Sequence, residues 1–461
     1  MTGGADDYRA DDGGKVDTSS RALGRLGAWS VLDQCVFSGT NFLTAVLIGR
    51  YGDARELGRY SLAISLVMLL MVLQNSLLVS PYVVIRSEWQ ASQWARLRGS
   101  MLVACGILVI LGLAIIPLAT FSFIGLPLWA WCVLIPAASL RDYVRRIALA
   151  AMNIKRAFVW DLSTAFFQIS ALAWVIVRNA NSDTASGLNS VTGITCVSGA
   201  WLLVAALGLI FTHKEYRFEP RQIIGDWKAL WPVGRWVGLA QGVSTVQAYT
   251  LPWLMAIAHS LELAGIYAAC WTLVQVVSPA IEGVGNLLGP ILANSAAKRS
   301  WESMIGQAKM TAAIFAASMI SLGVLMIWFG GWALETVYGP EYAAFYPILL
   351  ILTLAATINN VGIPAGKSLI QIDHASAHFW ISLTAFTIVT CLSTILLILL
   401  GPVGAAWGLV TGALFGSSMR WGKLVSLKEQ VKNTSTPWHR HREAAVDKSD
   451  TVNSPTAGGV L

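Results

Sequence analysis

The chain has 461 residues, of which 55% are hydrophobic and only 12% are charged. Soluble domains carry about 25% charged residues, so this composition excludes an ordinary soluble protein and indicates that lipid surrounds most of the chain. The net charge of +7 does not indicate a nucleic-acid partner, because the basic residues lie in short segments between apolar runs, as the positive-inside rule describes. All six cysteines lie in apolar segments without pairing or metal-ligand spacing, and we predict no metal site and no cofactor.

The apolar runs predict an all-α, multi-pass membrane protein with about twelve transmembrane helices, since one span needs about 20 apolar residues. The predicted spans are 26–49, 58–85, 100–120, 123–147, 157–177, 188–212, 232–257, 262–292, 309–337, 343–371, 375–400 and 402–425. Residues 1–20 and 427–461 are polar tails that we expect to be disordered.

A repeated pattern divides the chain into two halves. Residues 27–67 align without a gap with residues 234–274, and ten of the 41 positions are identical, including Gly58/Gly265. A second pair, 157–166 and 377–386, also matches in part. Such duplication is typical of transporters.

We therefore expect two six-helix bundles, an N-terminal lobe at 21–212 and a C-terminal lobe at 232–426. Because each half has an even number of spans, a pseudo-twofold axis would run along the membrane normal. The segment between them, 213–231, is expected to be a cytoplasmic amphipathic linker that contains an interfacial helix.

The distribution of Lys and Arg sets the expected orientation. With the N-terminus in the cytoplasm, only four of the 32 basic residues fall on the outer side, and these are Arg50, Arg55, Arg59 and Arg178. The positive-inside rule therefore predicts that both termini face the cytoplasm. We expect a monomer in the cytoplasmic (inner) membrane, in contact with membrane lipid.

Polar side chains inside the spans are the candidate functional residues. A charge at mid-membrane costs about 2.5–3.5 kcal/mol on insertion scales, so such residues must face a wet cavity or a partner. The charged candidates are Asp33, Arg141, Arg145, Asp161, Glu282 and Lys367. The uncharged candidates are Gln34, Asn41, Gln241, Asn286, Asn359 and Asn360.

Several of these residues also have purely structural explanations. Arg145 could anchor at the headgroups, and Asp161 could cap its helix. The long aliphatic side chain of Lys367 could let its ammonium group reach the cytoplasmic surface. Arg141 could pair with Asp161 or Asp33 as readily as it could contact substrate. Glu282 and Asp33 are harder to explain in this way, because both lie inside apolar runs.

The sequence contains no recognisable catalytic motif, and the outer loops are too short to hold a catalytic domain. The longest outer loop is 178–190, which is polar and small. We therefore do not expect an enzyme.

Four stretches resemble the polysaccharide exporters. They are LIGRYGDARELGRYSLAISL (47–66), GIYAACWTLVQVVSPAIEGVGNLLGPILA (265–293), YGPEYAAFYPILLIL (338–352) and GPVGAAWGLVTG (401–412). The chain from about residue 21 to 426 resembles the Wzx-like polysaccharide or oligosaccharide-lipid flippases of the MOP exporter superfamily, which also contains the MATE drug antiporters and the lipid II flippases.

This resemblance implies a twelve-helix, two-lobed flippase that moves a lipid-linked glycan across the membrane by alternating access. It implies that Arg141, Arg145 and Lys367 contact a diphosphate, for which a guanidinium fork is well suited. It also implies ion coupling, by H⁺ or Na⁺, at Asp33, Asp161 and Glu282. The polar candidates Gln34, Asn41, Gln241, Asn286, Asn359 and Asn360 would line the cavity. Span 1 lacks the buried Arg of the lipid II flippases, which argues against that substrate.

Two other functions remain open at this point. A MATE-type antiporter of small cations would have a cavity rich in carboxylates and aromatic side chains, and the arginines of span 4 count against it. A membrane glycan polymerase or ligase would need a larger outer loop.

Overall fold

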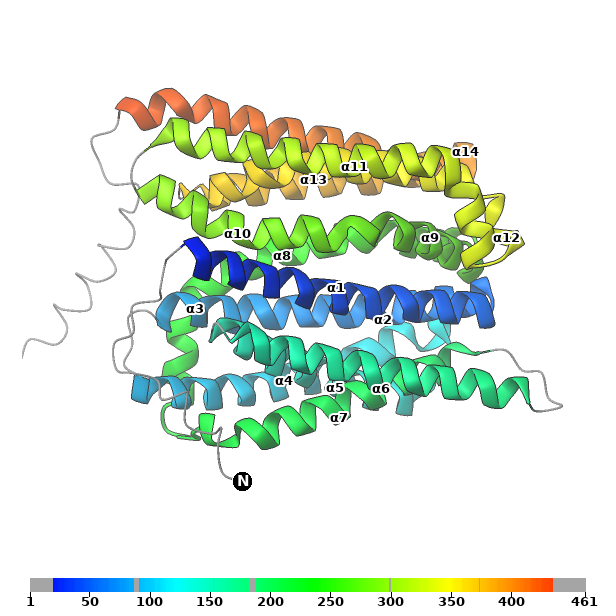
Figure 1. Cartoon of the computed structure of the whole chain (residues 1–461), viewed down its shortest axis with the longest axis horizontal. Helices are drawn as coiled ribbons and strands as arrows, with labels where there is room; N and C mark the ends of the chain where they lie inside the picture. Colours follow the sequence, from blue (N-terminus) through cyan, green and yellow to red (C-terminus); the bar gives the residue numbers. More distant parts are fainter. Residues whose placement is uncertain are drawn as a thin grey trace, which may run out of the picture.

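The computed structural model describes residues 20–86, 91–151, 153–181, 188–297, 300–372 and 374–433. These residues form long helices that run side by side, with no strand among them (Figure 1). The first bundle contains α1 (Ser20–Tyr51), α2 (Ala54–Gln74), η1 (Asn75–Val79), α3 (Ser80–Arg86), α4 (Ala91–Ile124), α5 (Leu128–Ala150), α6 (Ile154–Ala180) and α7 (Ser190–Thr212). A short helix, η2 (His213–Glu215), follows. The second bundle contains α8 (Ile223–Ala258), α9 (Leu261–Val274), η3 (Gln275–Val277), α10 (Ser278–Ala297), α11 (Trp301–Val337), α12 (Pro340–Ala343), α13 (Tyr346–Gln371) and α14 (Ala375–Asn433).

These elements make twelve spans, six in each bundle, and confirm the predicted fold class. The second span is continuous from α2 through the π-helical turn η1 into α3, and the eighth runs from α9 through η3 into α10. The last element, α14, is two spans, because Gly401 has a φ of 71° and breaks the helix in the middle. Pro402 then starts the final span, a position where its missing N–H costs no helical hydrogen bond.

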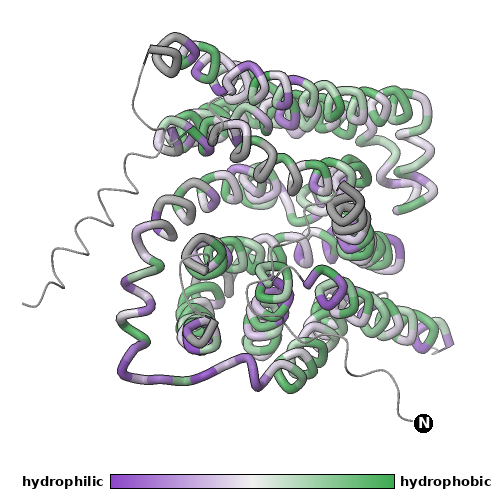
Figure 2. Tube along the Cα trace, turned by 60° about the vertical axis from the view of Figure 1, so that its left-hand side comes forward, coloured by the Kyte–Doolittle hydropathy of each residue, from purple (hydrophilic) through white to green (hydrophobic). Residues whose placement is uncertain are grey.

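The helices are apolar along most of their length (Figure 2). Within the described residues, nine helices are long and apolar enough to cross a membrane, with Ser376–Lys428 counted as one. The helices α5 and α8 are more polar. The first carries Arg141, Asp142, Arg145 and Arg146, and the second carries Gln241, Thr245, Gln247 and Thr250. The polar character of α5 is explained by the site described below.

The sequence repeat has a direct counterpart in the packing of α2 against α9. A Cβ placed on Gly58 would lie 1.9 Å from the carbonyl oxygen of Leu261, and a Cβ on Gly265 would lie 1.7 Å from that of Ala54. Gly265 and Leu261 are the repeat partners of Gly58 and Ala54, 207 positions further on. Each helix therefore meets the other through the same residues, as an axis of twofold symmetry requires.

The ends of the repeated helices also coincide. Tyr51 ends α1 and Ala258, its repeat partner, ends α8. Asp53 then caps α2 by accepting a hydrogen bond from Glu56 N, and Ser260, at the partner position, caps α9 by accepting one from Leu263 N. Different cap residues thus place the same turn in both halves.

The segment between the bundles is attached to the first one. Arg217 N donates to Ala95 O of α4, and Gly99 packs so closely that a Cβ there would lie 2.2 Å from Arg217 O. Asp226, near the start of α8, accepts hydrogen bonds from Arg96 and Ser100. The amphipathic stretch expected as an interfacial helix is the first part of α8, which continues without interruption into the seventh span.

The start of α1 and the end of α14 lie on the same side of the bundle (Figure 1). The short helix α12 lies on the opposite side. This arrangement follows from the even number of spans.

Candidate substrate and coupling sites

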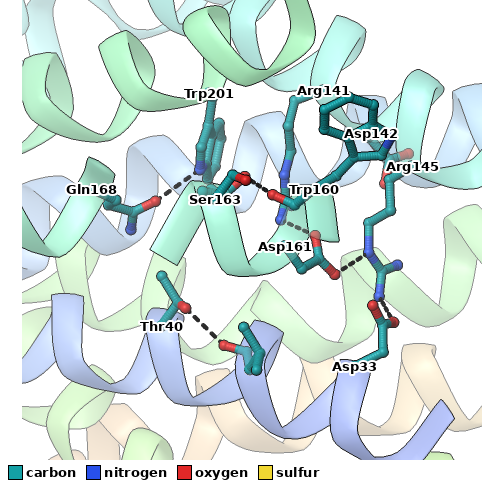
Figure 3. A network of polar contacts seen from close by, with 12 residues as sticks. Asp33, Thr40, Arg141, Asp142, Arg145, Trp160, Asp161, Ser163, Gln168 and Trp201 are labelled. Atoms are coloured by element: carbon teal, nitrogen blue, oxygen red, sulfur yellow. Dashed lines mark hydrogen bonds and ion pairs between the residues drawn. The ribbon is translucent and has the colours of Figure 1, made fainter. Parts of the chain in front are cut away.

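Four charged side chains from three helices form one network inside the first bundle (Figure 3). Arg145 of α5 donates through Nε to Asp161 Oδ2 of α6 at 2.5 Å and through Nη2 to Asp33 Oδ2 of α1 at 2.6 Å. Arg141, one turn earlier on α5, donates through Nη2 to Asp161 Oδ1 at 2.5 Å. Asp161 therefore binds both arginines, and Arg145 joins both carboxylates.

The network is almost sealed from solvent. Asp33, Arg141, Arg145 and Asp161 are between 1% and 5% exposed. Two positive and two negative charges cancel, which reduces the cost of burying them, provided that the pairing is complete. The Phe37 ring adds a cation–π contact to each arginine, with its centroid 4.8 Å from Cζ of Arg145 and 5.1 Å from Cζ of Arg141.

A chain of neutral hydrogen bonds extends from this network along α6. Trp201 of α7 lies with its ring 5.8 Å from Cζ of Arg141 and donates from Nε1 to Gln168 Oε1 at 2.9 Å. Gln168 in turn donates to Thr44 Oγ1 of α1 at 2.7 Å. These bonds fix the relative positions of α1, α6 and α7, and therefore the geometry of the ion pairs.

Some atoms of the network have no hydrogen-bond partner among the described residues. These buried atoms are Asp33 Oδ1 and Arg141 Nε. Asp33 thus uses one carboxylate oxygen for Arg145 and keeps the other uncommitted. A carboxylate oxygen in that position can accept a proton.

A cavity of about 580 Å³ lies between the two bundles. The residues that line it come from α1, α2, α8, α9, η3 and α10 and are Cys35, Phe37, Ser38, Gly39, Asn41, Phe42, Ala45, Leu57, Tyr60, Ser61, Ile64, Met68, Tyr249, Ala268, Trp271, Thr272, Gln275, Val276, Ser278, Pro279 and Glu282. This volume is in the range of pockets that hold drug-sized molecules.

The cavity lining is aromatic and carries one charge. Among the residues that line it, Glu282 is the only charged one. Its aromatic side chains come from both bundles, with Tyr60 from α2, Tyr249 from α8 and Trp271 from α9 among them. Phe37 belongs both to the cavity wall and to the ionic network, so the two sites share this one side chain.

The other predicted site residues are distributed as follows. Asn41 lines the cavity. Gln34 lies next to the network residue Asp33, is half-buried, and its Oε1 has no partner among the described residues. Lys367 is half-buried and donates from Nζ to Gly285 O of α10 at 2.5 Å.

The remaining uncharged candidates do not line this cavity in the part of the chain that the structure describes. Gln241 and Asn359 have exposed side chains, and that of Asn360 is half-buried. The side chain of Asn286 lies outside the described residues.

The structure thus brings Asp33, Arg141, Arg145 and Asp161 together and places Asn41 and Glu282 at the cavity. Sequence reasoning did not select the aromatic residues of the cavity, because Tyr60, Tyr249 and Trp271 are unremarkable in an apolar chain. Nor did it select Arg420, a buried basic residue of the last span, although a lone Arg within an apolar run is a usable signal.

No protein-family model matches the chain, and no curated protein matches it. Solved structures do. The inward-facing conformation of a multidrug resistance MATE family transporter of the MOP superfamily matches with a TM-score of 0.68 and 13% identity, over 89% of this chain and 96% of that chain. The outward-facing conformation of such a transporter matches with a TM-score of 0.66, 13% identity and the same coverage.

A third similar structure is a MOP superfamily transporter from Pyrococcus furiosus, described as having a binding pocket of reverse polarity that suggests a different function. It matches with a TM-score of 0.66 and 12% identity, over 89% of this chain and 96% of that chain. At these identities the likeness concerns the fold. The chain is therefore a multi-pass membrane protein with the fold of the MATE transporters of the MOP superfamily.

Proposed function

We propose that this protein is an exporter of small organic cations that works by alternating access and is driven by protons. The observation that carries the proposal is the cavity between the bundles, whose lining combines five aromatic side chains with the single carboxylate of Glu282. Aromatic faces attract cations, and the exposed carboxylate of Glu282 can pair with a cation that enters the cavity.

The buried network of the first bundle is the proposed coupling site. Asp33 binds Arg145 through one oxygen only. A proton on Asp33 would remove its charge, weaken the bond to Arg145 and leave a net positive charge in the network. Because Phe37 packs against both arginines and lines the cavity, a shift of Arg145 would move the Phe37 ring in the cavity wall.

The orientation of the protein in the membrane is part of this proposal. We place the side that holds Ser20, Asn433 and the basic linker in the cytoplasm, as the positive-inside rule requires. The N-terminal lobe (21–212) and C-terminal lobe (232–426) would rock about the α2–α9 contact, and the linker 213–231 would connect them. The protein would act as a monomer in the cytoplasmic membrane.

A lipid-linked glycan flippase is the second candidate function. It is favoured by the hydroxyl and amide groups in the cavity lining, from Ser38, Asn41, Thr272, Gln275 and Ser278, which could bind sugar hydroxyls. Against it, Arg141 and Arg145, the expected diphosphate contacts, are already neutralised by Asp33 and Asp161. Lys367 would be the remaining cation of that set.

A binding experiment separates the two functions. The purified full-length protein is titrated with tetraphenylphosphonium, and quenching of tryptophan fluorescence reports binding, since Trp271 lines the cavity. The cation function predicts saturable binding that weakens at least tenfold in Glu282→Gln. Glu302→Gln, at the first turn of α11 and outside the cavity, is the matched control and should bind as the wild type does.

The glycan function predicts the reverse pattern. The protein would then not bind tetraphenylphosphonium, and cells without it would accumulate lipid-linked glycan in the inner leaflet. Saturable binding that is unaffected by Glu282→Gln would remove Glu282 from the substrate site.

A further inference from the structure

The second bundle contains a buried arginine that no carboxylate neutralises among the described residues. Arg420, in the last span, is 9% exposed. Its hydrogen bond to a side chain is a long one, from Nη2 to Ser382 Oγ at 3.5 Å. Its Nε is buried and has no partner among the described residues.

A histidine, His378, lies beside this arginine. Its Nδ1 is likewise buried without a hydrogen-bond partner among the described residues. Both side chains pack against Gly366 of α13, because a Cβ there would lie 2.7 Å from His378 Cε1 and 3.4 Å from Arg420 Cδ. A guanidinium and an imidazole thus contact the same glycine inside the bundle, with the hydroxyl of Ser382 one helical turn from His378.

The internal repeat shows that a buried acid of the first bundle has no counterpart in the second. When 157–166 is aligned with 377–386, Asp161 corresponds to Ile381. Asp161 is the carboxylate that binds both arginines of the first bundle, whereas Ile381 is a buried apolar side chain. The second bundle therefore has no acid at the position that corresponds to Asp161. Arg420 itself lies on the twelfth span and is not the counterpart of Arg141 or Arg145, which lie on the fourth.

A guanidinium buried within a membrane span is stable only when a counter-charge or other polar groups compensate it. No carboxylate among the described residues supplies this compensation, and an anion bound from solution would do so. Hydrogen bonds to charged groups are the strongest that such a site can form.

We propose that Arg420, Ser382 and His378 bind a small monovalent anion, of the size of chloride, within the second bundle. Arg420 would donate from Nε, Ser382 from its hydroxyl, and His378 from Nδ1–H. The anion must be small because the groups that would bind it lie inside the bundle, where Ser382 and Arg420 are buried. The site does not depend on which substrate the cavity takes.

The test is equilibrium binding of radioactive chloride to the purified full-length protein, with gluconate, an anion too large for the site, keeping the ionic strength constant. We expect saturable binding of about one chloride per chain and a thermal unfolding midpoint that rises with chloride concentration. Arg420→Gln should abolish both effects. Lys423→Gln removes a cation one turn further along the same helix and should leave both intact.

A second variant supplies the missing acid. Ser382→Asp places a carboxylate next to Arg420, so this variant should no longer bind chloride, while its unfolding midpoint in gluconate should match that of the wild type in chloride. This result would also show that the protein folds when the site is internally neutralised. Chloride binding that is absent from the wild type, or retained in Arg420→Gln or Ser382→Asp, would overturn the proposal.

Discussion

At the scale of single residues, the two carboxylates of the buried network have unequal roles. Asp161 accepts from both arginines and uses both oxygens, while Asp33 accepts from Arg145 alone and leaves Oδ1 uncommitted. The carboxylate of Asp161 therefore stabilises the fold, whereas the carboxylate of Asp33 is available for protonation.

This difference predicts that Asp161→Asn and Asp33→Asn behave differently. Removing the charge of Asp161 leaves two buried guanidiniums with one carboxylate, and losing one partner of a buried ion pair costs about 3–5 kcal/mol. Asp33→Asn leaves Arg145 paired with Asp161 and should cost clearly less. Unfolding of the purified variants by denaturant, followed by tryptophan fluorescence, measures both. Equal losses of stability would show that the two carboxylates are equivalent.

The coupling role assigned to Asp33 gives a prediction of its own. Asp33→Asn should still bind tetraphenylphosphonium, because Glu282 and the aromatic wall are intact, but binding should no longer release a proton. A pH indicator in weakly buffered detergent solution detects the release. Wild-type release that persists unchanged in Asp33→Asn would assign the proton to another group.

At the scale of secondary-structure elements, the contact between α2 and α9 fixes how the bundles meet. Gly58 and Gly265 have no side-chain carbon, and the backbones of the two helices are therefore in direct contact at these positions. Any side chain at these positions would separate the helices, and overpacking of this kind costs about 1–3 kcal/mol.

We therefore expect Gly58→Ala and Gly265→Ala to destabilise the protein by similar amounts, because their surroundings are related by the pseudo-twofold axis. Gly306→Ala in α11 is the control, since no other atom lies within 4 Å of a Cβ there and Ala is the better helix former. Thermal unfolding midpoints in detergent measure these differences. A Gly58→Ala variant as stable as the wild type would mean that α2 and α9 are further apart than described.

The elements were predictable from the sequence to a large extent, and the sites less so. The twelve spans and the two-bundle fold follow from apolar runs and from one internal repeat, because lipid demands long apolar helices. The direct contact of Gly58 with Leu261 and of Gly265 with Ala54 was not foreseen, since a repeat shows that two positions are equivalent but not that they touch.

The polar residues within the spans were found because a charge there is costly, but their partners were not determined by spacing. Arg145 was compatible with a substrate cavity and with the headgroups, and Arg141 with a substrate contact and with a pairing to Asp161 or Asp33. Distinguishing these requires the rotation and tilt of α1, α5 and α6, which depend on packing among all the helices. The aromatic cavity was missed for the same reason, because Tyr249 and Trp271 resemble ordinary lipid-facing residues until the bundles are placed together.

At the scale of the whole molecule, charge is separated between two sites. The first bundle holds a neutral network, and the cavity between the bundles carries the carboxylate of Glu282. A cation in the cavity and a proton on Asp33 would each change the charge of a different site, and Phe37 connects them. This arrangement suits the exchange of one cation for another in a two-bundle fold that opens to each side in turn.

Transport in proteoliposomes tests this account most directly. Vesicles that contain the full-length protein and have an acidic interior are mixed with tetraphenylphosphonium, and its uptake is followed with an ion-selective electrode. The account predicts uptake that depends on the pH gradient in the wild type, and its loss in both Asp33→Asn and Glu282→Gln, with Glu302→Gln unaffected. Absence of uptake by the wild type, or uptake that does not require the pH gradient, would contradict it.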